Sequence, residues 1–281
     1  MGKVNEMEFN LREQALQRTL IAAHRGAAGG NIPCNTLDAF DVALRQGADM
    51  IELDVSASQD GQLFVFHPGM EPAHLGSPRL IRDMTAREVG ELGFWNQDNT
   101  PSGHKISTLD QALEHLKGRC YINIDKFWEN VEPITQAVRR HGMADQILVK
   151  TGPNEEIFNQ METLAPELNY MLVIRNSDEY SRRLRTRAFH YVGAEVLFDR
   201  EDAPVASPAY IEEMHRSGLL VWANAIVYDY RAVLAAGHND DVSVVGREDA
   251  GWGWLLDRGF DIIQTDWPLA LRLYLQGRAQ A

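Results

Sequence analysis

Short apolar runs alternate with helical patterns along most of the chain. A strand sends successive side chains to opposite faces, whereas a helix repeats its apolar positions every three or four residues. Alternation of the two patterns is typical of parallel strands joined by helical crossovers. The strands are predicted at Leu20–Ala23, Met50–Val55, Tyr121–Asp125, Ile147–Lys150, Tyr170–Ile174, Glu195–Leu197, Leu220–Asn224 and Ile262–Gln264. The helices are predicted at Thr36–Gln46, Leu109–Lys117, Val131–His141, Asn154–Leu164, Asp178–Phe189, Pro208–Ser217 and Trp252–Arg258.

Eight strands in 281 residues favour an α/β fold of the (β/α)8 type, the TIM barrel, over an open sheet. We expect one barrel domain over residues 1–281, with residues 1–18 as an N-terminal extension. A turn at Gln59-Asp60-Gly61 predicts a β-hairpin directly after the second strand. Residues 67–108 then form an insertion. A long loop at 227–251 precedes the last strand, and loops of this length in a compact domain are usually functional or mobile.

Composition and charge restrict the classes of function. The formal net charge is −13, which argues against a nucleic-acid-binding surface because such surfaces need clustered positive charge. Only two cysteines occur, so no disulfide framework is predicted. The N-terminus lacks the apolar core of a signal peptide, and no apolar run approaches the length of a membrane span. We expect a cytoplasmic protein without a membrane span, as a monomer or homodimer.

Two acidic residues at the end of the second predicted strand indicate a metal site. Glu52 and Asp54 share one face of the strand, where like charges repel unless a cation lies between them. Asp125, at the end of the third strand, supplies another carboxylate. Three oxygen ligands suit Mg²⁺ or Ca²⁺ better than zinc. The alternative is structural: Asp54 caps a helix or loop, and Glu52 pairs with Arg25 or Lys126.

Further polar residues also end the predicted strands, where the reactive groups of such barrels lie. His24 and His67 are the candidate acid and base, because histidine titrates near neutrality. Arg25 and Lys150 are candidates for neutralising a phosphate, with salt bridges to the same acids as the alternative. The other polar or aromatic residues in these places are Asn123, Lys126, Trp222, Asn224, Gln264 and Asp266.

In its motifs the chain resembles the glycerophosphodiester phosphodiesterase family, within the phospholipase-C-like phosphodiesterases. The motifs are His24-Arg25-Gly26, Pro33-Cys34-Asn35-Thr36, Ile51-Glu52-Leu53-Asp54-Val55, Asp60-Gly61 with His67, Ile106-Ser107-Thr108-Leu109-Asp110, Asn123-Ile124-Asp125 and the closing run Gly259–Pro268. The resemblance implies a TIM barrel with catalytic His24 and His67 and a divalent metal on Glu52, Asp54 and Asp125. We assign substrate or phosphate binding to Arg25, Asn35, Lys126, Lys150, Trp222 and Asn224.

The chain departs from the family pattern at three positions. Cys34 replaces a glutamate, Pro68 replaces an aspartate that could orient His67, and Asp125 replaces the usual glutamate. These changes keep the minimal apparatus but leave the alcohol part of the substrate open.

Three hypotheses follow from the residues and the resemblance. The first is a metal-dependent hydrolase that converts a glycerol- or sugar-containing phosphodiester into an alcohol and a phosphomonoester by histidine acid–base catalysis. The second is an enzyme specific for an opine-like sugar phosphodiester, either a hydrolase or a lyase that releases a cyclic phosphate. The third is a barrel that binds phosphodiesters without turning them over.

Overall fold

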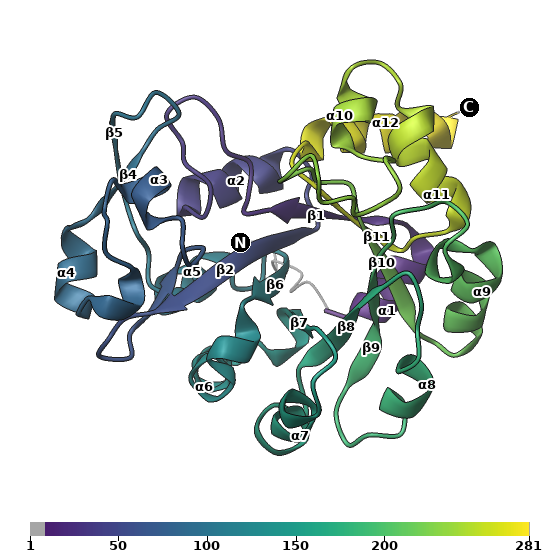
Figure 1. Ribbon diagram of the computed structural model, residues 1–281, viewed down its shortest axis with the longest axis horizontal. Helices are drawn as coiled ribbons and strands as arrows, with labels where there is room; N and C mark the ends of the chain where they lie inside the picture. Colours follow the sequence, from purple (N-terminus) through teal and green to yellow (C-terminus); the bar gives the residue numbers. More distant parts are fainter. Residues whose placement is uncertain (1–8, 281) are drawn as a thin grey trace, which may run out of the picture.

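The computed structural model describes residues 9–280, and its centre is a closed parallel β-barrel (Figure 1). The barrel strands follow the order β1, β2, β6, β7, β8, β9, β10 and β11, and the ring closes because β1 pairs with both β2 and β11. The predicted TIM barrel is therefore confirmed. The strands of the ring are β1 (Leu20–His24), β2 (Met50–Ala57), β6 (Tyr121–Asp125), β7 (Ile147–Thr151), β8 (Asn169–Arg175), β9 (Tyr191–Leu197), β10 (Leu220–Asn224) and β11 (Ile262–Thr265).

Strand alternation divides the buried side chains into two clusters. One face of each barrel strand packs against the surrounding helices, as Ile51, Leu53 and Val55 of β2 do. The other face points into the barrel lumen. A smaller cluster fills the end of the lumen at the amino ends of the strands: Leu11, Ala15, Leu20, Ala22, Met50, Tyr121, Leu148, Met171, Val192, Leu220, Trp222 and Ile262. The apolar cluster closes one end of the barrel, so that the polar inward positions gather towards the other.

The described chain contains twelve α-helices, of which seven overlap the predicted helices and five were not predicted. They are α1 (Leu11–Gln17), α2 (Leu37–Arg45), α3 (Glu71–Leu75), α4 (Ala86–Glu91), α5 (Leu109–Leu116), α6 (Val131–His141), α7 (Glu155–Leu164), α8 (Ser181–Leu184), α9 (Pro208–Arg216), α10 (Asp240–Val244), α11 (Trp254–Arg258) and α12 (Pro268–Gln280). The predicted helix at Asp178–Phe189 is wrong in length, because only α8 is helical. Beyond α8 the chain places Phe189 against Tyr170, with ring centroids 5.2 Å apart.

The segment expected to be an N-terminal extension contributes to the barrel. Residues 1–8 lie outside the described residues, but α1 inserts Leu11 and Ala15 into the lumen cluster. Phe9 packs edge-on against Tyr121 of β6, with ring centroids 5.2 Å apart. The start of the described chain therefore closes the end of the barrel opposite the polar positions.

The insertion at 67–108 has its own small core beside β2, and Figure 1 shows it as a lobe at the left of the view. The predicted hairpin is present, because β3 (Leu63–Val65) pairs antiparallel with the end of β2. A second pair, β4 (Gly93–Trp95) and β5 (Pro101–Lys105), forms a separate small sheet. The lobe's apolar core comprises Phe64, Phe66, Leu75, Ile81, Met84, Val89, Phe94 and Ile106.

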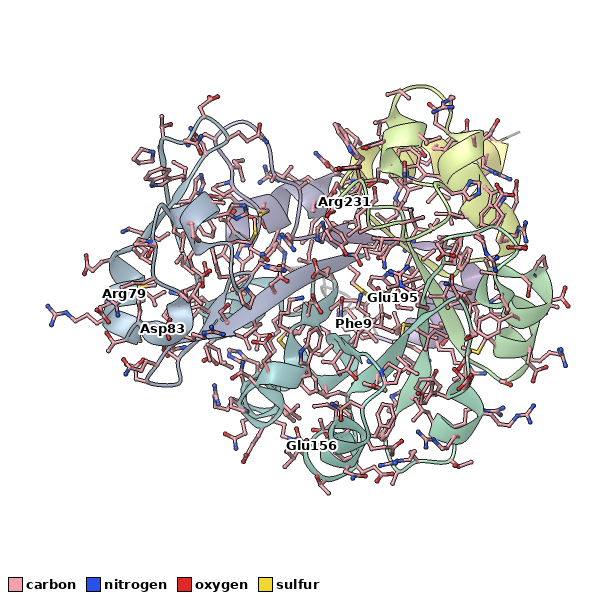
Figure 2. All side chains as sticks on the ribbon, in the orientation of Figure 1. Phe9, Arg79, Asp83, Glu156, Glu195 and Arg231 are labelled. Carbon is pink, nitrogen blue, oxygen red and sulfur yellow. The ribbon has the colours of Figure 1, made fainter. Side chains whose placement is uncertain are left out.

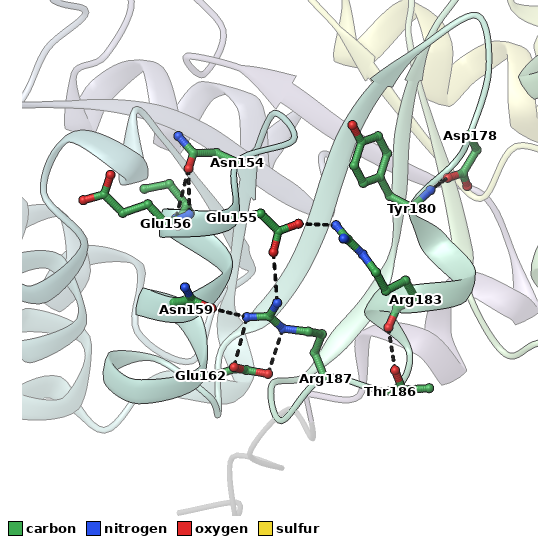
Figure 3. Close-up of polar contacts among 11 residues, drawn as sticks. Asn154, Glu155, Glu156, Asn159, Glu162, Asp178, Tyr180, Arg183, Thr186 and Arg187 are labelled. Carbon is green, nitrogen blue, oxygen red and sulfur yellow. Dashed lines mark hydrogen bonds and ion pairs between the residues drawn. The ribbon is translucent and has the colours of Figure 1, made fainter.

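An exposed ion network joins α7 to the segment that follows α8 on the outside of the barrel (Figure 3). Arg187 donates through Nε to Glu162 at 2.8 Å and pairs with Glu155 at 3.2 Å. Arg183 also pairs with Glu155.

Among the described residues, no helix is both long and apolar enough to cross a bilayer.

Candidate active site

The polar residues at the carboxyl ends of the barrel strands surround one cavity of about 410 Å³. Every strand of the ring contributes to its lining, which comprises His24, Arg25, Glu52, His67, Asp125, Lys126, Trp128, Lys150, Gly152, Val173, Glu195, Leu197, Asn224, Ile226, Tyr228, Leu234 and Gln264. This is the position at which barrels of this type carry their reactive groups. Trp222 and Asn35, both predicted to contact substrate, are absent from the lining because they are buried behind it.

Three carboxylates meet at one side of the cavity, two in its lining and the third, Asp54, buried beside them. Glu52, Asp54 and Asp125 each offer an oxygen within 4.8 Å of the others. Burial, reinforced by the neighbouring Asp54, raises the pKa of Glu52 to about 7. Asp54 is fully buried, and its Oδ1 has no hydrogen-bond partner among the described residues. Three crowded oxygen donors with an unpartnered buried atom fit a hard divalent cation.

Asp54 is held through Oδ2, while its Oδ1 has no hydrogen-bond partner among the described residues. Asn35 donates through Nδ2 to Asp54 Oδ2 at 2.9 Å, and Arg25 Nε lies 2.8 Å from the same oxygen. The backbone N–H of Arg25 donates to Glu52 Oε2 at 2.9 Å. The structural alternative for Arg25, a salt bridge with these acids, is thus present, and Asn35 orients a carboxylate instead of lining the cavity.

The backbone is strained where it carries these residues. Arg25, Asn35 and Lys126 have φ angles of 57°, 58° and 59°, in the left-handed region that non-glycine residues rarely adopt. Gly26 has φ 82°, and a Cβ there would lie 2.8 Å from the carbonyl carbon of Ala39. The His24-Arg25-Gly26 turn therefore requires its glycine.

His24 and His67 occupy different environments in the same cavity. His24 Nδ1 lies 2.8 Å from Asp266 Oδ1, beyond the end of β11. Burial alone would lower the pKa of His24, but the hydrogen bond to Asp266 and the charge of Glu52 outweigh it and raise that pKa. His67 Nε2 lies 4.0 Å from Asp54 Oδ1, and burial lowers the pKa of His67. Their environments thus favour a charged His24 and a neutral His67.

Cys34 is not among the residues that line the cavity, and its surroundings do not activate the thiol. Its Sγ is 4.0 Å from Nδ1 of His74, and burial raises the pKa of the thiol to about 11. A thiol with so high a pKa is a poor nucleophile near neutral pH.

The two lysines of the cavity pair with different acids. Lys126 Nζ lies 3.0 Å from Asp125 Oδ2. Burial opposes ionisation of Asp125, but the charges of Lys126 and Lys150 outweigh it and lower the pKa of Asp125. Lys150 does not pair with the three acids named above. It forms an ion pair with Glu195, which lies within the ring of strands in Figure 2.

Glu195 belongs to a buried polar network that the sequence reading missed. Its Oε1 accepts a hydrogen bond from Asn224 Nδ2 at 2.6 Å, and Asn224 Oδ1 accepts one from Trp222 Nε1 at 3.2 Å. Lys150 Nζ lies 3.9 Å above the Trp222 ring. The sequence did contain a signal, because Glu195 interrupts the otherwise apolar run Val192–Leu197. Such a glutamate inside a predicted strand needs a buried partner.

Comparison with known proteins identifies the family to which the chain is similar. The model of the glycerophosphoryl diester phosphodiesterase family matches residues 24–269. A glycerophosphodiester phosphodiesterase of Caldanaerobacter subterraneus subsp. tengcongensis is 27% identical over 164 residues, which cover 56% of this chain and 67% of that protein. One from Bacillus altitudinis is 29% identical over 185 residues, which cover 61% and 75%.

Solved structures agree in fold over nearly the whole chain. A glycerophosphodiester phosphodiesterase from Agrobacterium tumefaciens superposes with a TM-score of 0.62 at 26% identity, covering 90% of this chain and 98% of that one. A phosphodiesterase from Oleispira antarctica, solved with the product sn-glycerol-3-phosphate, gives a TM-score of 0.67 at 18% identity and covers 95% and 99%. With a family match over most of its length, the chain belongs to the glycerophosphoryl diester phosphodiesterase family and is a phosphodiesterase.

Proposed function

We propose that this phosphodiesterase hydrolyses a glycerol- or sugar-containing phosphodiester to an alcohol and a phosphomonoester. One observation carries the proposal: Glu52, Asp125 and two histidines of opposite environment line a single cavity at the carboxyl end of the barrel, and the carboxylate of Asp54 lies within 4.8 Å of both acids. The sn-glycerol-3-phosphate bound to the Oleispira antarctica relative supports a glycerol phosphate as one part of the substrate.

Glu52, Asp54 and Asp125 would hold a divalent cation, Mg²⁺ or Ca²⁺, since all three donors are carboxylate oxygens. When bound, the cation would reduce the negative charge of the phosphodiester and favour ionisation of a nearby hydroxyl. Arg25 and Lys126 line the same part of the cavity and would neutralise charge that builds on the phosphoryl oxygens.

His24 is assigned as the general acid and His67 as the general base. The carboxylate of Asp266 fixes the ring of His24 and favours its protonated form. His67 has no comparably close carboxylate partner among the described residues, and it lines the cavity in a form that can accept a proton. Two groups whose environments separate their protonation states suit opposite roles in one reaction.

The reaction then proceeds in two balanced steps. His67 removes the proton of a substrate hydroxyl next to the phosphate, and that oxygen attacks phosphorus. The bond from phosphorus to the departing alcohol breaks, and His24 gives its proton to the departing oxygen. The resulting cyclic phosphate is opened by water in the reverse sense, with His24 accepting a proton and His67 returning one.

The test is turnover of a glycerophosphodiester with added Mg²⁺ or Ca²⁺, before and after chelation, followed by phosphorus NMR. We expect chelator-sensitive release of a phosphomonoester. A cyclic ester that accumulates without monoester would instead identify a lyase. Tight binding of phosphodiesters without any chelator-sensitive turnover would identify a binding protein and overturn the proposed function.

A further inference from the structure

The side of the cavity formed by β7, β9, β10 and β11 is lined by a row of polar side chains. Gln264 of β11 is paired in register with Asn224 of β10, and Asn224 bonds to Glu195 of β9. Glu195 in turn pairs with Lys150 of β7. All four line the cavity, and each is at least nine-tenths buried. We refer to Lys150, Glu195, Asn224 and Gln264 as the amide wall.

The amide wall has no net charge. The ammonium group of Lys150 is neutralised by Glu195 and also lies against the Trp222 ring. A neutral wall does not select an anionic group. Nor does it suit a quaternary ammonium group, because Lys150 already occupies the Trp222 ring face that such a cation would use. What remains is recognition of neutral groups by hydrogen bonding.

Gln264 is the member of the wall that is free to make such bonds. The residue is 5% exposed and lines the cavity, and its amide has no hydrogen-bond partner among the described residues. Ile262, two residues earlier on the same strand face, lies in the lumen cluster, so Gln264 also faces inward. An amide that faces a cavity without a protein partner is available for hydrogen bonds with a ligand or water. A hydroxyl group can accept from the Gln264 N–H and donate to its oxygen.

The place of Gln264 indicates which part of the substrate it contacts. Asp266, two residues further along the chain, holds His24, the proposed acid for the departing alcohol. Gln264 therefore lies deeper in the barrel than Asp266, which holds the histidine that would protonate that alcohol. Given the proposed function, we propose that Gln264 binds hydroxyl groups of the departing alcohol and selects phosphodiesters of neutral polyols, such as glycerol or a sugar.

The test uses two esters of glycerol phosphate that differ only in the departing alcohol, glycerol in one and 1-propanol in the other. The wild-type protein should show a higher kcat/KM for the glycerol ester. Gln264→Met keeps the length of the side chain and removes its hydrogen bonds. It should lower the preference about three- to tenfold, the worth of about one hydrogen bond between neutral groups. The same change on the exposed surface of α6, Gln136→Met, is the matched control.

Each result bears on a defined part of the proposal. No preference in the wild-type protein would overturn the role of the amide wall without requiring any variant to fold. A preference unchanged in Gln264→Met, or lowered equally in Gln136→Met, would also overturn it. In all three cases turnover of the propyl ester would leave the proposed function intact. Absence of metal-dependent turnover of both esters would overturn the proposed function itself.

Discussion

The two halves of the cavity are built from different kinds of side chain and backbone. The carboxylate half comes from β1, β2, β6 and the loops after them, and it crowds charges around Glu52, Asp54 and Asp125 on a backbone with left-handed residues. The other half is the amide wall, which comes from β7, β9, β10 and β11. There the opposite charges of Lys150 and Glu195 cancel each other, and the strands are regular. Backbone strain and crowded charges therefore lie where we place the bond-breaking chemistry. Hydrogen-bonding groups without net charge lie where we place recognition of the departing alcohol.

The largest effects should follow from removing the histidines of the carboxylate half. His24→Ala and His67→Ala should each lower kcat by about 10²-fold or more, because each removes one proton transfer. The exposed His190 gives a matched control, His190→Ala, with little expected change.

A change of leaving group separates the two histidines. A 4-nitrophenyl ester needs little help from an acid, so the defect of His24→Ala should shrink while that of His67→Ala remains. Equal defects of the two variants on esters of both kinds would contradict the assigned roles.

The amide wall should respond more in stability than in chemistry when its ion pair is broken. Lys150→Met leaves Glu195 buried without its partner, and we expect a loss of about 3 kcal/mol in the free energy of unfolding. Arg183→Met breaks an exposed pair with Glu155 and should cost less than about 1 kcal/mol. Urea unfolding of both variants measures the difference. Equal losses would show that burial of the Lys150 pair has no energetic consequence.

The pH dependence of stability tests the crowding of the carboxylates. The folded-state pKa of Glu52, about 7, lies above its usual value of 4.5, so the metal-free folded protein binds this proton more tightly than the unfolded chain. The stability that this bound proton contributes to the folded protein is fully present below about pH 4.5 and is lost as the pH rises through about 7. Melting of the metal-free protein between pH 5 and 8 should show this loss, and Mg²⁺ or Ca²⁺ should restore stability at the upper end. Glu52→Gln should flatten the profile.

The same residue should alter metal affinity, with the smallest of the expected effects. Glu52→Gln keeps the side chain's shape and removes one of three negative charges. We expect the apparent affinity for Mg²⁺ or Ca²⁺ to fall about tenfold, and excess metal should partly restore activity. Glu91→Gln, in the exposed part of α4, is the control. Unchanged affinity in Glu52→Gln, measured by calorimetry, would remove Glu52 from the metal site.

The barrel and the grouping of Glu52, Asp54 and Asp125 could be predicted from the amino-acid sequence. Strand periodicity alone places Glu52 and Asp54 on one face, and parallel strands bring their carboxyl ends together. Asp125 and His24 follow from the same rule, because each ends a barrel strand, whereas His67 follows the antiparallel hairpin strand β3 and does not. These inferences need only local periodicity and the rule that the active site lies at one end of the barrel.

The amide wall and the partners of the two histidines could not be predicted from the sequence. Asp266 lies 242 residues from His24 in the chain, and Lys150 pairs with Glu195 across the lumen, from strands that are not neighbours. Asn35 and Trp222 also lie behind the cavity instead of in it. Periodicity shows which way a side chain points along its own strand, but not which side chain it meets across the barrel. That depends on the stagger between strands and on packing, which are set only when the ring closes.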